Sequence, residues 1–157
     1  MIQVELPDGS SRSLEEGAST ADLAAQIGPG LAKAAVAARV NDQIVDLARP
    51  LNNGAKVSIL TKRDQEALEV LRHSAAHLMA DAILRLFPKA QLTIGPVVED
   101  GFYYDIYLAE GKITPDDFKN IEDEMKKVAK EAHPFTRCVA SYDEANEHFA
   151  RYQAIDG

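Results

Sequence analysis

The stretch RHSAAHLMADAI, residues 72–83, places two histidines four positions apart in a segment that otherwise has the composition of a buried helix. At about 100° per residue, His73 and His77 fall on one face, one turn apart. Apolar residues share that face, and the opposite face carries an apolar stripe made of Leu68, Leu71, Ala75, Leu78, Ala82 and Leu86. The pattern predicts a helix that is apolar on two sides and sandwiched inside its domain, with both imidazoles lining a crevice or hydrogen-bonded in a core.

The residues around this helix predict an α+β domain. Asp64 is a candidate cap for a helix from about Gln65 to Phe87, which Pro88 ends. Thr114 precedes a proline and two acids, a typical helix start, and Ser141 opens a capping box for a last helix. The other predicted elements are strands over residues 92–94, 102–108 and 135–140, a loop over 95–101 and a helix over about 115–132.

The first 62 residues predict a smaller module with the order β-β-α-β-β-β, which suits a β-grasp, ubiquitin-like fold. Ser19 or Thr20 can cap the single helix, and Gly28-Pro29-Gly30 stops it. The predicted strands are residues 2–6, 11–14, 35–40, 44–45 and 57–60, with turns at 7–10 and 41–42. Residues 1–62 carry 6 basic and 7 acidic groups, whereas residues 63–157 carry 11 and 18, so the charge also indicates a boundary near residue 62.

Composition limits the class of protein. A chain of 157 residues that is 46% hydrophobic and 27% charged is ordinary for a globular protein. It contains neither a secretory signal nor an apolar run of the ~20 residues that cross a bilayer, and it has a single cysteine, so we expect a cytoplasmic protein with no membrane partner. The net charge of −8 argues against sequence-blind nucleic-acid binding and leaves room for RNA contact through a local patch.

The histidine pair allows two interpretations, and the residues alone slightly favour a structural one. A zinc protease would have Glu directly after the first histidine, where this chain has Ser74, and catalytic zinc needs a third protein ligand. Cys138 is a candidate ligand only by its chemistry, so we predict no metal site. Two neutral imidazoles can still hold a water molecule or relay protons near pH 7.

Four stretches change this balance: LPDGS, AQIGPGLAKAAVAARVN, KVSILTKRDQEALEVLRHSAAHLMADAI and TIGPVVEDGFYYDI, in this order and at close spacing. Together they resemble the N-terminal part of bacterial threonyl-tRNA synthetases, from residue 1 to about residue 149. The resemblance implies that residues 1–62 form a TGS domain. Residues 63–157 would then be the first part of the editing domain shared with alanyl-type synthetases, an incomplete α+β domain built on a long central helix.

The same resemblance implies an editing site and its substrate. The family's editing site uses a histidine pair on the long helix, which corresponds to His73 and His77 in this chain. It also uses a tyrosine of the Gly-Phe-Tyr-Tyr-Asp strand, which corresponds to Tyr104. We also place Gly95 among the substrate-binding residues. The implied reaction hydrolyses serine that was wrongly esterified to threonine tRNA, because a site for threonine cannot strongly reject an analogue lacking one methyl. The implied partner is the acceptor arm of that tRNA.

The departures from the family leave three alternatives. A Cys-x-x-x-His pair and a lysine that complete the family's editing site are not found, and neither are the catalytic domain, which uses ATP, Mg and Zn, and the anticodon-binding domain. We therefore expect no cofactor in this fragment, and a monomer although the full-length family is homodimeric. The chain could be an N-terminal fragment of the ligase, a stand-alone deacylase acting in trans on mischarged tRNA, or a non-catalytic TGS-type binding or regulatory module.

Overall fold

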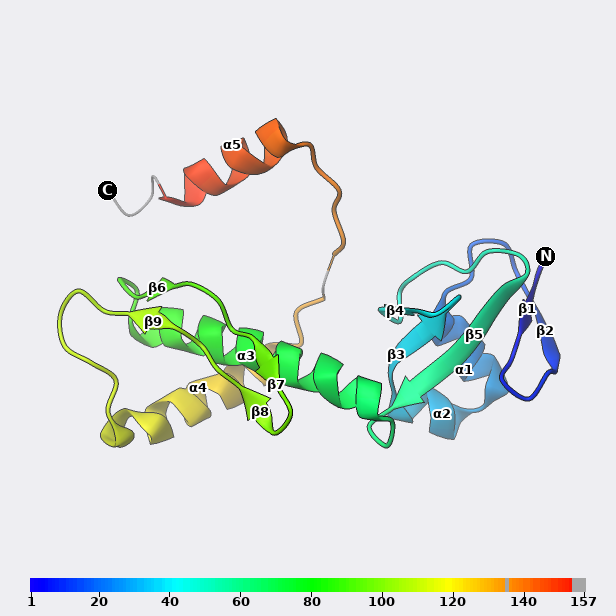
Figure 1. Cartoon of the computed structure of the whole chain (residues 1–157), viewed down its shortest axis with the longest axis horizontal. Helices are drawn as coiled ribbons and strands as arrows, with labels where there is room; N and C mark the ends of the chain where they lie inside the picture. The colour runs from blue at the N-terminus through cyan, green and yellow to red at the C-terminus, as the bar shows by residue number, and fades with distance from the viewer. Residues whose placement is uncertain (135, 154–157) are drawn as a thin grey trace.

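The computed structural model describes residues 1–134 and 136–153, without the side chains of residues 149 and 151–153. A small sheet with two helices lies at one end, and a long helix leads from it to a second, helical part (Figure 1). The elements are β1 (Ile2–Glu5), β2 (Ser11–Leu14), α1 (Thr20–Ile27), α2 (Pro29–Ala34), β3 (Ala35–Val40), β4 (Gln43–Val45), β5 (Ala55–Thr61), α3 (Gln65–Leu86), β6 (Gln91–Leu92), β7 (Val97–Val98), β8 (Gly101–Phe102), β9 (Ile106–Tyr107), the 3₁₀ turn η1 (Pro115–Asp117), α4 (Phe118–Glu131) and α5 (Tyr142–Gln153).

The first part is a five-stranded mixed sheet in the order β2-β1-β5-β3-β4. Only β1 and β5 run parallel: α1 and α2 carry the chain from β2 across to β3, and β5 later returns between β3 and β1. Alternate residues of the strands face a core made of Ile2, Val4, Leu14, Leu23, Ala38, Leu51, Ala55 and Val57. This arrangement confirms the predicted β-grasp fold and the α+β class.

The segment Gly28-Pro29-Gly30 ends one helix and also begins another. Ser19 and Asp22 form a reciprocal capping box at the start of α1, as the sequence predicts, and Gly28 terminates that helix. Pro29 is then the first residue of α2, which the sequence analysis missed. Proline is favoured at the first helical position because its missing N–H would have no partner there, so the signal was present in the sequence.

Helix α3 has the predicted bounds to within one residue, but its predicted apolar stripe is only partly buried. Leu71 and Leu86 of the predicted apolar stripe are 40% and 38% exposed. The residues that α3 buries are instead mostly alanines, namely Ala67, Ala76, Ala80, Ala82 and Ile83. Ala82 belongs to the predicted stripe and is fully buried, so the stripe is buried only in part. Small side chains let neighbouring elements approach α3 closely, so alanines form much of the buried surface of the helix. Alanine is only weakly hydrophobic, so an apolar pattern in the sequence is dominated by leucines instead.

Helix α3 follows the sheet with almost no linker. The Asp64 carboxylate does not cap the helix; it accepts hydrogen bonds from the Thr61 N–H (2.7 Å) and hydroxyl (3.0 Å) at the end of β5. Ala67 packs with Ala37 and Leu60 of the sheet in a small cluster. An ion pair between Arg39 on β3 and Glu66 crosses the same junction.

The strands of the second part are shorter than predicted. β6 pairs with β9 and β7 pairs with β8, each an antiparallel ladder of two residues per strand. The predicted loop 95–101 thus contains most of a hairpin, and the predicted strand 102–108 is interrupted between β8 and β9. The predicted strand 135–140 is also wrong for residues 136–140, which are not in a strand, and residue 135 lies outside the described residues.

Helix α4 completes a second core against α3. Thr114 and Asp117 form the capping box that leads through η1 into α4, close to the predicted start. Ile83, Ala90 and Ile121 are the buried centre of this core. Ser141 caps α5 through Glu144, as predicted, and α5 stands apart from the other elements at the end of an extended connection (Figure 1). Over the described ranges, no helix combines the length and apolar character that crossing a membrane requires.

Candidate functional site

The two predicted histidines of α3 contact each other directly. Their Nε2 atoms are 2.9 Å apart, and their rings meet edge to face with centroids separated by 4.6 Å. Both residues are exposed, so the expectation that they line a crevice or lie in a core is wrong for this chain as described. The four-residue spacing on a helix is what brings the two rings to the same face one turn apart.

This contact fixes the hydrogen bonding of the pair. Two ring nitrogens at hydrogen-bond distance share one hydrogen, so one ring donates through Nε2–H and the other accepts through a bare Nε2. A neutral imidazole pair of this kind contains one base and one donor next to each other, on a surface that water and a ligand can reach. The donating ring keeps a bare Nδ1 and the accepting ring keeps an Nδ1–H, so the pair can accept a proton at one Nδ1 and deliver one from the other.

Tyr104 and Gly95, the other predicted site residues, also contact each other. Backbone hydrogen bonds hold the two segments together, from Asp105 N to Ile94 O (3.1 Å) and from Tyr103 N to Pro96 O (3.0 Å). The Tyr104 ring then lies over the Gly95 Cα so closely that a Cβ there would come within 2.5 Å of Cδ2. Tyr104 is half-buried, whereas the neighbouring Tyr103 is 68% exposed.

Tyr104 also lines an apolar cavity of about 800 Å³ between α3, α4 and β9. Met79 and Ile83 contribute the α3 wall, and Phe118 and Ile121 contribute the α4 wall. Neither histidine lines this cavity. The structure thus assembles the four predicted residues as two contacting pairs, and in the part of the chain that it describes no hydrogen bond joins the pairs.

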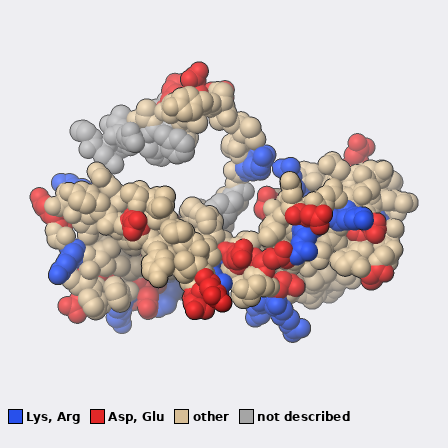
Figure 2. All heavy atoms as spheres, in the orientation of Figure 1, with Lys and Arg blue, Asp and Glu red and all other residues tan. Residues whose placement is uncertain are grey.

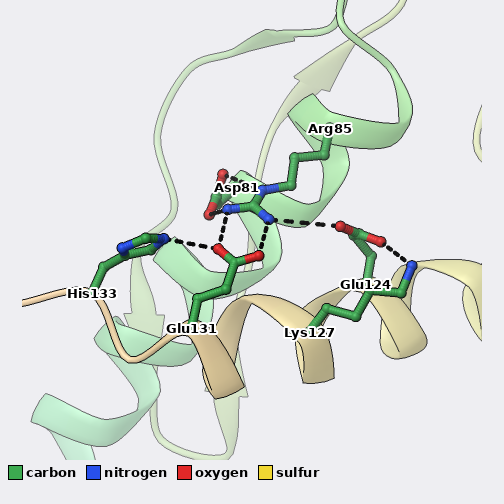
Figure 3. A network of polar contacts seen from close by, with 6 residues as sticks. All are labelled: Asp81, Arg85, Glu124, Lys127, Glu131 and His133. Atoms are coloured by element: carbon green, nitrogen blue, oxygen red, sulfur yellow. Dashed lines mark hydrogen bonds and ion pairs between the residues drawn. The ribbon is translucent and has the colours of Figure 1, made fainter.

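An arginine that the sequence analysis did not single out ties α4 to α3 (Figure 3). The Arg85 guanidinium donates to both carboxylate oxygens of Glu131, at 2.7 and 2.8 Å, and to both oxygens of Asp81, at 3.2 Å. It also lies 3.7 Å from Glu124. The four-residue spacing of Asp81 and Arg85 on a helix was the available signal for part of this network.

The network shifts the proton equilibria of its members. Hydrogen bonds from Arg85, and then from His133, lower the pKa of Glu131 to about 2. Glu131 and Asp81 in turn raise the pKa of Arg85 above its ordinary value. Because α4 ends at Glu131, the ion pair fixes the C-terminal end of that helix on α3.

The residues described here gather no set of three or more His, Cys, Asp or Glu side chains that could hold a metal ion. Cys138, the one thiol that the sequence analysis weighed as a ligand, is exposed on the connection between α4 and α5.

Comparisons with known proteins agree with the two-part fold. A family model described as the TGS domain matches residues 2–61. The threonine--tRNA ligase of Citrifermentans bemidjiense is 54% identical over 129 residues, which cover 82% of this chain and 20% of that protein. The threonine--tRNA ligase of Hahella chejuensis is 48% identical over 151 residues, or 96% of this chain and 24% of that protein. That of Staphylococcus saprophyticus is 46% identical over 149 residues, or 95% and 23%.

The chain thus spans about a quarter or less of the length of the curated relatives it matches, while nearly all of it is aligned. The matched part is the N-terminal part of those relatives. These findings confirm the resemblance that the four sequence stretches indicated: residues 2–61 are a TGS domain, and the chain corresponds to the N-terminal region of the threonine--tRNA ligase family.

Proposed function

We propose that this chain is the tRNA-contacting and editing part of a threonine--tRNA ligase. The full-length protein would attach threonine to its tRNA with ATP, and residues 1–157 would contact the acceptor arm and contribute to hydrolysis of mischarged seryl-tRNA. The observation that carries the proposal is the exposed His73–His77 pair, whose Nε2 atoms are 2.9 Å apart. In this proposal, ATP, magnesium and zinc are bound by the rest of the full-length protein and not by residues 1–157.

The proposed editing step uses the two imidazoles in different roles. The ring that donates through Nε2–H keeps a bare Nδ1, and this Nδ1 accepts a proton from a water molecule as the water oxygen attacks the ester carbonyl carbon. The bond between that carbon and the ribose oxygen then breaks, and the other ring returns a proton to the ribose oxygen. The products are free serine and uncharged tRNA, and the pair ends with the same number of protons.

Tyr104 and Gly95 are proposed to bind the aminoacyl end of the substrate. The missing side chain of Gly95 leaves room for the Tyr104 ring, and the phenol of Tyr104 offers a hydroxyl that can donate to or accept from the ligand. For this role the ester must lie between the two residue pairs, so we infer that substrate or the rest of the ligase completes the site.

The proposal divides the chain into a TGS domain over residues 1–62 and the first part of the editing domain over residues 63–157. We propose further that the fragment alone is a monomer in the cytoplasm, and that the full-length protein dimerises. Sedimentation of the purified chain tests the first of these statements directly.

Hydrolysis of seryl-tRNA and threonyl-tRNA, both made on threonine tRNA, tests the function. In a full-length relative, His73→Ala and His77→Ala, made at the aligned positions, should each slow seryl-tRNA hydrolysis by about 10²–10⁴-fold, the usual contribution of acid–base catalysis. Ser74→Ala is the matched control because it lies between them on the same helix and bonds only the Val70 carbonyl. Wild-type rates in both histidine variants would refute the proposal.

The same assay on residues 1–157 alone separates the alternatives. Turnover by the chain itself that depends on His73 identifies a stand-alone deacylase. Binding of tRNA without turnover identifies a fragment whose editing site is completed elsewhere in the ligase, and neither activity identifies a non-catalytic module.

A further inference from the structure

A groove of about 790 Å³ lies between the TGS domain and the connection from α4 to α5. The loop over residues 46–50 forms one wall, and Thr136 and Arg137 form the other. Basic groups from the two sides meet at this place in Figure 2, where the connection passes the sheet domain. The groove therefore brings Arg49 and Arg137 together although 88 positions separate them in the sequence.

Among the residues that the structure describes, no acidic side chain pairs with either arginine. In residues 1–134 and 136–153, no ion pair or side-chain hydrogen bond involves Arg49 or Arg137, whereas Arg39 and Arg85 are both paired. Asp46 is the one acidic residue that lines the groove, and its Oδ1 already accepts the Ala48 N–H at 2.8 Å. In a chain with net charge −8, two unneutralised guanidinium groups at one groove form a local site for an anion.

The TGS wall of the groove is held rigidly. Thr20 is fully buried, and its hydroxyl lies within hydrogen-bond distance of the carbonyls of Asp46 (3.2 Å) and Leu47 (2.9 Å). The Thr20 N–H donates to the Arg49 carbonyl (3.2 Å) and the Ala21 N–H donates to the Leu47 carbonyl (2.9 Å). The backbone that carries Arg49 is thus fixed to the start of α1, which lowers the entropy cost of using its side chain for binding.

We propose that this groove binds the phosphodiester backbone of the tRNA acceptor arm, with Arg49 and Arg137 each contacting a phosphate. This inference rests on the proposed function, because it names the surface through which the tRNA is held. Guanidinium groups match phosphate oxygens with two parallel hydrogen bonds. Contacts of this kind with phosphates position the RNA without reading its sequence.

Fluorescence anisotropy with labelled threonine tRNA transcript, at several salt concentrations, tests the proposal on the 157-residue chain. Arg49→Gln and Arg137→Gln should each weaken binding several-fold and reduce the slope of log affinity against log salt by about 0.9. The double variant should lose about twice that slope. Arg12→Gln is the matched control, because Arg12 is exposed on β2, at the edge of the sheet opposite to β4. It should change neither the affinity for tRNA nor the salt slope.

A trypsin footprint gives a second readout that needs no substitution. Bound tRNA should slow cleavage after Arg137 and leave cleavage after Arg12 unaffected; Arg49 gives no signal in this assay because Pro50 follows it and blocks trypsin. Wild-type affinity and salt slope in the double variant, or equal protection after Arg12 and Arg137, overturn the groove as the binding surface while tRNA contact by the chain stands. No binding of tRNA by the wild-type chain overturns both the groove and the proposed tRNA contact.

Discussion

The ring of Tyr104 occupies the space that a side chain at Gly95 would need, since a Cβ there would lie 2.5 Å from Cδ2 and 2.6 Å from Cε2. The backbone is also close, with the Tyr103 carbonyl oxygen 3.2 Å from the same point. Two residues that the sequence analysis chose separately as substrate-binding are therefore one structural unit, and neither can change without moving the other.

Gly95→Ala should accordingly push the Tyr104 ring out of its place. We expect a loss of about 1–3 kcal/mol in the free energy of unfolding, the usual effect of overpacking, and altered NMR signals of the Tyr104 ring protons. Gly101→Ala is the control, because nothing lies within 4 Å of the Cβ it would add. If Tyr104 binds substrate, Gly95→Ala in a full-length relative should slow editing as much as Tyr104→Ala does. An unchanged ring spectrum would contradict the described packing.

The stability of the α3–α4 pair should depend on pH through Glu131. Its pKa is about 2 in the folded chain, below the ordinary 4.5, so its ionised form stabilises the fold fully above about pH 4.5. That contribution disappears as the pH falls from 4.5 towards 2. Urea unfolding at pH 7 and pH 3 should therefore show a larger loss for the wild type than for Glu131→Gln.

Glu110→Gln is the matched control for this titration, because Glu110 is exposed and belongs to none of the ion pairs of the described residues. It should retain the wild-type pH dependence. Equal pH dependence in the wild type and in Glu131→Gln would show that Arg85 does not hold α4 in the way the hydrogen bonds indicate.

Ala67 should be the most sensitive position at the junction of the sheet and α3. It is fully buried against Ala37 and Leu60, so Ala67→Leu must separate the helix from the sheet and should cost about 1–3 kcal/mol of unfolding free energy. Glu69→Leu introduces the same side chain two residues later at an exposed position and should change stability by less than about 0.5 kcal/mol. Thermal unfolding of both variants measures the difference, and similar values would mean that the helix is not docked on the sheet.

Thr20→Val should loosen the loop that carries Arg49. The substitution keeps the shape of the side chain but leaves the carbonyls of Asp46 and Leu47 without the hydroxyl donor, at a cost of about 1–3 kcal/mol. Thr93→Val removes a comparable hydroxyl, bonded at 3.1 Å to the Asp105 carbonyl, from an exposed site where water can replace it. Hydrogen exchange at the Arg49 and Leu51 amides should accelerate only in Thr20→Val; unchanged exchange would contradict the anchoring role.

The sequence predicted those elements whose boundaries depend on local chemistry. The capping boxes at Ser19, Thr114 and Ser141, and the stops at Gly28 and Pro88, were all visible because caps and breakers act within one turn. Strand 11–14 and strand 35–40 were also predicted with the observed bounds.

The face that α3 buries could not be predicted in the same way. An apolar stripe of leucines outweighs alanines on any hydropathy scale, yet the helix buries the small residues Ala76 and Ala80. The Arg49–Arg137 groove and the Arg85–Glu131 pair join residues 88 and 46 positions apart, and no periodicity in the sequence reports such contacts. The histidine pair was predicted from spacing alone, because four residues on a helix fix the distance between its rings.

Because α3 follows β5 directly, the long helix sets the direction of the histidine pair relative to the TGS domain as well as its distance. Its 22 residues extend for about 33 Å, and Ala67 fixes its rotation against the sheet. The six-residue interval from Ala67 to His73 then sets the angle around the helix axis at which the imidazoles project, relative to the TGS domain. One residue added in that interval would turn the pair by about 100° around the helix axis. Four added residues would nearly restore its original direction and would move it about one helical turn further from the TGS domain.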